Sequence, residues 1–159
     1  MGTRAHKAKG PQAVKVAVLS ISTTRSLAND ESGHWIAKRA RKLGHVVVDH
    51  QVITDEVAAI RTGLAAALAK APQVVLITGG TGISPKDVTI EAVQPLFSKT
   101  LSAFGILFAQ LSFEEIDSAA IMSRAAAGVI GTSAVFCMPG SLKACKLACS
   151  QLIFPELGH

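Results

Sequence analysis

Three glycines and an aspartate follow a short apolar run in residues 74–89, VVLITGGTGISPKDVT. The run Val74–Ile77 has no apolar–polar alternation, which is typical of a strand buried on both faces. Glycines permit backbone angles and close approaches that a Cβ forbids, and here they stand at Gly79, Gly80 and Gly82. This combination favours a turn whose backbone lies directly against a ligand, with a phosphate as the first candidate.

The glycine turn matches neither of the common nucleotide-binding loops. A Walker loop ends in Gly-Lys-Ser/Thr, where this chain has Pro85-Lys86-Asp87. The dinucleotide fingerprint needs a final glycine at the position of Pro85. Because a glycine turn after a strand is at least as often architectural as functional, this motif alone leaves both explanations open.

Polar or acidic residues follow three other predicted strands. The stretches are SISTTRSLANDESG (20–33), Thr54-Asp55-Glu56 and Met138-Pro139-Gly140-Ser141. Each has a structural alternative as well as a functional one. Asp55 and Asp87 can favour the start of a following helix through its dipole. Ser141 can cap a helix, although the same helix start also suits an anion.

Taken together, these segments favour chemistry on a phosphorylated substrate. The carboxyl ends of parallel strands share one edge of a sheet, so backbone N–H groups and two carboxylates meet there. Asp55 and Asp87 repel a phosphate unless a cation lies between them, and oxygen ligands beside a phosphate are typical of Mg²⁺. Lys86 and Lys143 can offset further charge. We therefore predict magnesium-assisted chemistry at this edge.

Strand and helix patterns alternate along the chain. Strands are predicted at 14–22, 45–53, 74–77 and 133–138, and helices at 33–43, 57–71, 116–129 and 141–153. Thr89 is expected to cap a short helix that contains Pro95, and Phe104, Leu107, Phe108 and Leu111 form an apolar helical stripe. Alternation with short links predicts a three-layer, doubly wound α/β fold with a mostly parallel, Rossmann-like sheet.

The composition is that of one compact domain. The chain has 159 residues, of which 49% are hydrophobic and 17% charged. Three of the 16 Lys and Arg residues lie in residues 1–12, so 13 cations face 11 acids in the remainder. We interpret residues 1–12 as a flexible basic tail and 13–159 as a single domain, and we expect no nucleic-acid partner.

The sequence also bears on compartment and on metals. No apolar run reaches the length of a membrane span and no signal-like leader opens the chain, which favours a cytoplasmic protein without a membrane partner. The three cysteines, Cys137, Cys145 and Cys149, form a late, odd cluster. Cys145 and Cys149 are four apart on a predicted helix, but core packing is a better explanation for them than a metal site.

Several segments resemble the MoaB/Mog family of molybdenum cofactor biosynthesis proteins. The resemblance covers Val14 to Leu157 and is carried by DESGHWI (30–36), VITDEVAAI (52–60), LITGGTGISPKDVTIEA (76–92), LSFEEI (111–116), SRAAAG (123–128) and MPGSLKA (138–144). The fourth and fifth of these segments are more similar to the MoaB branch than to the Mog branch.

The resemblance implies a function and a set of site residues. Family members bind molybdopterin, and the adenylyltransferases among them transfer AMP from Mg-ATP to its terminal phosphate. The residues implied to hold the phosphate-bearing side are Gly79, Gly80, Thr81, Gly82, Gly140 and Ser141. Asp55 and Asp87 match the two essential acids, which are implied to be catalytic and to hold Mg²⁺.

The resemblance further implies an oligomer, either a trimer or a dimer of trimers. For the reaction, one alternative stays open, because a binding protein of the same pathway could hold molybdopterin or a precursor without adenylating it. Both acids are present in this chain, which favours the enzyme.

Overall fold

The computed structural model of the protein describes residues 13–159. Its strands are β1 (Lys15–Ile21), β2 (Val46–Ile53), β3 (Val74–Thr78), β4 (Lys99–Thr100), β5 (Ala126–Ile130) and β6 (Ser133–Met138). Its α-helices are α2 (Glu31–Lys42), α3 (Val57–Leu68), α4 (Thr89–Val93), α5 (Ser102–Ile116) and α6 (Leu142–Ala148). The N-terminal tail predicted at residues 1–12 lies outside the described residues.

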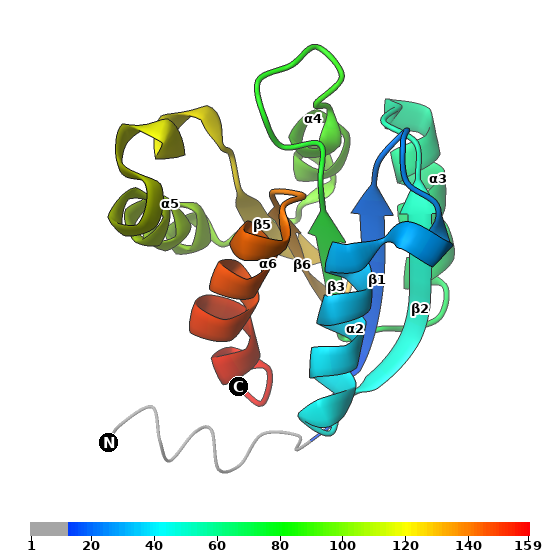
Figure 1. Ribbon diagram of the computed structural model, residues 1–159. Helices are drawn as coiled ribbons and strands as arrows, with labels where there is room; N and C mark the ends of the chain where they lie inside the picture. Colours follow the sequence, from blue (N-terminus) through cyan, green and yellow to red (C-terminus); the bar gives the residue numbers. More distant parts are fainter. Residues whose placement is uncertain (1–12) are drawn as a thin grey trace.

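The strands form one six-stranded sheet in the order β2-β1-β3-β6-β5-β4 (Figure 1). The first four strands of this order run parallel, whereas β5 is antiparallel to both β6 and β4. The chain leaves β1 in one direction to form β2 and then returns past β1 to form β3. The predicted doubly wound, mostly parallel α/β fold is therefore confirmed.

Alternating side chains of the central strands build a separate core on each face of the sheet. In β1, Val16 and Val18 pack with α2, α5 and α6, whereas Ala17 and Leu19 pack with α3 and α4. These β1 side chains are fully buried. The two helical layers on either side of the sheet complete the three-layer architecture.

One predicted helix is wrong. Residues 116–129 were expected to be mostly helical, but α5 ends at Ile116, a 3₁₀ segment spans Asp117–Met122, and Ala126–Ile130 is strand β5. Asp117 has φ 51°, a left-handed backbone conformation that ends the helix. The ladder of β5 with β6 then determines the strand, since a sequence of mainly small residues carries little pattern of its own.

Two smaller differences concern helix ends. Thr89 is the first residue of α4 and Val88 occupies the capping position, so the predicted cap at Thr89 is wrong. The predicted closing helix begins where expected, with Ser141 as its cap, but changes into a π-helical segment at Cys149–Ile153. The three cysteines are buried in the two cores, as the packing interpretation requires.

The connections place the loops that follow β1, β2, β3 and β6 at one edge of the sheet (Figure 1). The chain reverses direction across the sheet between β1 and β3, and ligands of doubly wound folds bind beside such a point. Among the described residues, no helix has the length and apolar character needed to span a membrane.

Candidate functional site at the carboxyl edge of the sheet

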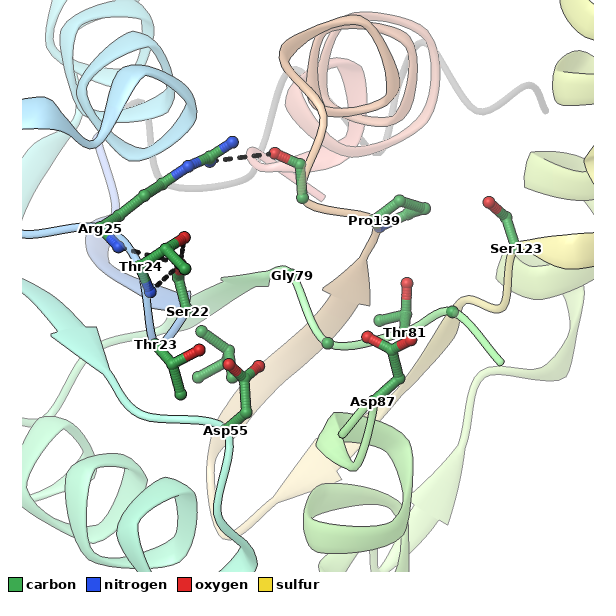
Figure 2. A pocket seen from close by; sticks show the side chains of 14 residues that line it. Ser22, Thr23, Thr24, Arg25, Asp55, Gly79, Thr81, Asp87, Ser123 and Pro139 are labelled. Atoms are coloured by element: carbon green, nitrogen blue, oxygen red, sulfur yellow. Dashed lines mark hydrogen bonds between the residues drawn. The ribbon is translucent and has the colours of Figure 1, made fainter. Parts of the chain in front are cut away.

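An open pocket of about 330 Å³ lies at this edge, between the carboxyl ends of β1 and β3 (Figure 2). Its walls come from the loops that follow β1, β2, β3 and β6, together with Ser123 from the segment before β5. The four strand ends that the sequence analysis grouped together therefore border one pocket.

Most of the predicted site residues border this pocket, and one does not. The residues that line it include Asp55, Asp87, Gly79, Gly80, Thr81, Gly82 and Gly140. Ser141 faces a smaller neighbouring cavity of about 90 Å³, and its hydroxyl accepts a hydrogen bond from the Ala144 N–H at 3.1 Å. The structure thus gives Ser141 a capping role and places it beside the pocket.

The glycines of the turn are needed first by the chain's own packing. Gly79 and Gly80 have φ of 96° and 65°, in the region that other residues rarely adopt. A Cβ on Gly79 would fall on the Ile21 carbonyl oxygen at the end of β1, and one on Gly80 would fall on the Thr89 hydroxyl. The turn therefore brings three segments of the chain closer together than a side chain would allow.

Asp87 closes the same loop from its other end. Its Oδ2 accepts a hydrogen bond from the Ser84 N–H at 2.9 Å, and its own N–H donates to the Ser84 carbonyl at 2.8 Å. A Cβ on Gly82 would lie 2.7 Å from the same Oδ2, so glycine is required where the carboxylate folds over the loop. The half-buried carboxylate of Asp87 is presented to the pocket in this position (Figure 2).

Asp55 reaches the pocket from the loop after β2 (Figure 2). The capping position of α3 belongs to Glu56, which makes no side-chain capping bond, and the half-buried Asp55 carboxylate accepts no hydrogen bond from residues 13–159. Asp55 is therefore available to a ligand.

The two carboxylates fit a hard divalent cation better than they fit zinc. No group of three or more His, Cys, Asp or Glu side chains that could hold a metal occurs within residues 13–159. Zinc sites need three or four such ligands, whereas Mg²⁺ is often held by one or two carboxylates plus phosphate oxygens and water. Asp55 and Asp87 beside an open pocket fit the second arrangement.

Arg124 organises the loop between β3 and α4, and sequence reasoning did not identify it. Its Nε donates to the carbonyls of Thr81 and Gly82 at 3.1 and 3.2 Å, and its Nη2 donates to the Asp87 carbonyl at 3.1 Å. It also forms an ion pair with Glu91. Hydrogen bonding to Arg124 lowers the pKa of Glu91, and the same bond raises the pKa of Arg124. The only sequence signal was its presence in the SRAAAG segment.

A second arginine, Arg25, lines the pocket from the loop after β1 and was also missed. Its guanidinium lies beside the loop after β6, where Nη1 is 3.4 Å from the Gly140 carbonyl oxygen (Figure 2). The sequence analysis had predicted that Lys86 and Lys143 offset the negative charge of the phosphate. Lys143 instead pairs with Glu115 at 3.1 Å beside the smaller cavity, and Lys86 does not line the pocket.

The loop that carries Arg25 is fixed at its far end by a buried carboxylate. Asp30 accepts hydrogen bonds from the Ser20 hydroxyl at 2.6 Å and from the Gly33 N–H at 3.0 Å, and it pairs with His50 Nε2 at 2.7 Å. Burial alone would raise the pKa of Asp30, but the hydrogen bonds from His50, Ser20 and Gly33 outweigh it and lower that pKa. Asp30 therefore ties the start of α2 to β1 and β2.

Comparison with known proteins gives consistent results. A family model described as "Probable molybdopterin binding domain" matches residues 17–159. Molybdenum cofactor biosynthesis protein B of Bacillus subtilis strain 168 is 46% identical over 161 aligned positions, which cover 100% of this chain and 95% of that protein.

Two solved structures extend the similarity to the fold. A crystal structure of Molybdenum cofactor biosynthesis protein B is 42% identical, with a TM-score of 0.90 and coverage of 95% of each chain. The tungsten cofactor synthesizing protein MoaB from Pyrococcus furiosus is 34% identical, with a TM-score of 0.82 and coverage of 92% of this chain and 96% of that one.

Proposed function

The chain belongs to the molybdopterin-binding domain family of molybdenum cofactor biosynthesis proteins, on its MoaB branch, and we propose that it adenylates molybdopterin. In this reaction an oxygen of the terminal phosphate of molybdopterin attacks the α-phosphorus of ATP. The bond from that phosphorus to the bridging oxygen breaks, AMP is transferred to the pterin phosphate, and pyrophosphate leaves.

The proposal depends chiefly on one observation, that Asp55 and Asp87 line a single pocket although 32 positions separate them in the sequence. Two anionic phosphates must approach each other in this reaction, and carboxylates alone would repel both. Mg²⁺ held by Asp55 and Asp87 would neutralise part of that phosphate charge. A site without a bound cation gains nothing from two carboxylates facing a phosphate.

The remaining residues of the pocket have positioning roles. Arg124 holds the loop carbonyls of Thr81, Gly82 and Asp87, and so sets where the Asp87 carboxylate stands. The Gly80 N–H in the turn is the proposed backbone contact of the substrate phosphate, because the neighbouring Gly79 N–H already donates to the Met138 carbonyl at 2.9 Å.

The test is to incubate the purified protein with molybdopterin, ATP and Mg²⁺ and to measure adenylated pterin and pyrophosphate. Asp87→Asn and Asp55→Asn should lower the rate by about a hundredfold or more, since a charge acting in the transition state is removed. Asn at position 87 can still accept the Ser84 N–H bond, so folding should be retained. Glu56→Gln is the matched control, because this neighbouring acid does not line the pocket.

Full activity in both Asn variants would refute the catalytic assignment. If the unmodified protein binds molybdopterin but forms no adenylated product, it is instead a binding protein of the same pathway.

We further propose that the chain forms a homo-oligomer through an apolar surface on α5 and the 3₁₀ segment after it. The predicted stripe is divided in the structure, because Phe104 and Phe108 are buried in the core whereas Leu107 is exposed. The exposed apolar residues of this surface are Ile106, Leu107, Phe113, Ile116, Ile121 and Met122. Such a patch is unusual on a monomer. Light scattering at micromolar concentration should give a trimer or a hexamer, and a monomer would contradict the proposal.

A further inference from the structure

The charged side chains that line the pocket are divided between two of its sides (Figure 2). Asp55 and Asp87 come from the loops after β2 and β3. Arg25 is the only Lys or Arg among the described residues of the lining, and it comes from the loop after β1, next to Gly140. An anion in this pocket therefore meets a cation on one side and two carboxylates on the other.

The backbone around Arg25 is fixed by hydrogen bonds, whereas its guanidinium makes only one long hydrogen bond within residues 13–159. The Arg25 N–H donates to the Ser22 hydroxyl oxygen at 3.2 Å, and Asn29 Oδ1 accepts from the Ser26 N–H at 2.6 Å on the other side of Arg25. A guanidinium has five N–H donors. Within residues 13–159 the only hydrogen bond from this one is the long contact of 3.4 Å to the Gly140 carbonyl.

A second group in the pocket lacks a partner. The hydroxyl of Thr81 is buried, and it has no hydrogen-bond partner among the residues that the structure describes. Leaving a buried hydroxyl unpaired is unfavourable. Thr81 belongs to the wall of the same pocket as Arg25, so a ligand with several acceptor oxygens would satisfy donors on both residues.

We propose that Arg25 binds the phosphate monoester of the acceptor substrate and so distinguishes that phosphate from the metal-bound phosphates of the nucleotide. A phosphate that arrives with Mg²⁺ brings its own cation and is suited to the side with Asp55 and Asp87. A phosphate monoester without a metal needs a cation from the protein, and planar guanidinium is well matched to its oxygens. The assignment to the acceptor rests on the proposed adenylyl transfer, whereas phosphate binding by Arg25 does not.

The structural alternative is that Arg25 only links the loop after β1 to the loop after β6. Phosphate binding by Arg25→Gln distinguishes the two roles, because loss of a purely structural link would leave phosphate binding unchanged. Glutamine has no charge and cannot bind phosphate with two parallel charged bonds. Lys86→Ala is the matched control, since it removes one exposed cation near the pocket without changing the pocket lining.

The first measurement is titration with inorganic phosphate in the presence of EDTA, followed by calorimetry or by amide chemical shifts. The unmodified protein should bind phosphate, and Arg25→Gln should weaken that binding by at least about tenfold. Lys86→Ala should change it less than about twofold at constant ionic strength. Asp87→Asn should leave it unchanged or strengthen it, because a repelling charge is removed.

The second measurement is the dependence of adenylation on each substrate. Arg25→Gln should raise the KM for molybdopterin by about tenfold or more, with the KM for Mg-ATP nearly unchanged. Unchanged phosphate binding in Arg25→Gln, or no phosphate binding by the unmodified protein, would overturn the proposal. A raised KM for Mg-ATP alone would overturn the assignment to the acceptor. Phosphate binding that depends on Arg25 in a protein without adenylation activity would refute the proposed function and leave the Arg25 site standing.

Discussion

Replacing Arg124 with Ala tests how the loop between β3 and α4 is held. The side chain reaches this loop from the segment before β5, more than 30 residues away in the sequence, and donates to three of its carbonyls. Only the ion pair with Glu91 has its acceptor in a side chain. The variant therefore removes the side-chain contacts that reach the loop from the segment before β5, while leaving both hydrophobic cores intact.

The expected magnitude follows from these contacts. The two carbonyls of Thr81 and Gly82 share one N–H, so the three contacts amount to about two charge-assisted hydrogen bonds. Such a bond contributes about 1.5–3 kcal/mol when desolvated, but the Arg124 side chain is 36% exposed, which lowers each value. The pair with Glu91, itself 51% exposed, adds about 0–1 kcal/mol. We expect Arg124→Ala to weaken loop closure by about 2–3 kcal/mol.

Native-state hydrogen exchange is the suitable assay, because the loop can open without global unfolding. The amides of Asp87 and Thr89 donate within the loop, to the carbonyls of Ser84 and Gly80. Their exchange should accelerate by about 30- to 150-fold in Arg124→Ala, which corresponds to the same free energy. The amide of Val75 in β3 should change much less.

Glu91→Gln is the control that isolates the ion pair. It keeps the carbonyl contacts and should cost less than about 1 kcal/mol. If Glu91→Gln accelerates exchange as much as Arg124→Ala does, the ion pair and not the carbonyl contacts holds the loop. Unchanged exchange in Arg124→Ala would show that the loop closes without the arginine.

Two further predictions concern residues that support the site. Gly79→Ala should destabilise the protein by about 2–4 kcal/mol in chemical denaturation, through strain at positive φ plus a clash with the Ile21 carbonyl. Gly44→Ala, also at positive φ but with open space around it, should cost only about 1–2 kcal/mol, and equal costs would exclude the clash. Asp30→Asn should be less stable than the unmodified protein at pH 7. Because folding lowers the pKa of Asp30 below its ordinary value of 3.8, this difference should shrink as pH falls past that value, and a constant difference would contradict the linkage.

The central part of the fold could be predicted because burial on both faces determines the sequence of its strands as well as their position. Strands β1 and β3 are covered on both faces, so nearly every side chain in them must be apolar, and such runs are visible in any sequence. The position of Asp55 follows from the same rule. Once two parallel strands are identified, the residues after their carboxyl ends must share an edge.

The rest of the fold could not be predicted because it depends on contacts between distant segments. Strand β5, Ala126–Ile130, is mostly small residues and becomes a strand by pairing with β6. Gly128 allows the Phe97 ring and the Lys99 backbone to approach this strand, and neither contact has a local signal. This antiparallel edge therefore depends on tertiary contacts alone.

The two arginines of the site were missed for a similar reason. Arg25 is 115 positions from Gly140, and Arg124 is 43 positions from Thr81. In the sequence, an isolated arginine cannot be distinguished from a solvated surface residue. The acids were easier to place, because Asp55 stands two positions after the end of β2 and Asp87 belongs to the glycine-rich loop that follows β3.

The glycine turn does lie at the pocket, but its glycines are required by the packing of the chain and not by a ligand. A ligand that needed the space beside Gly79 and Gly80 would find it filled by the Ile21 carbonyl and the Thr89 hydroxyl. Glycine at these two positions therefore serves the close approach of β1, β3 and α4 and would be required even without a ligand. Packing does not, however, explain the polar groups around the pocket that lack hydrogen-bond partners. The Asp55 carboxylate accepts no hydrogen bond within residues 13–159, the Thr81 hydroxyl is buried without a partner, and Arg25 keeps most of its donors unused. A fold gains no stability from leaving such groups unpaired around an open pocket, whereas a phosphorylated substrate with Mg²⁺ would pair with each of them.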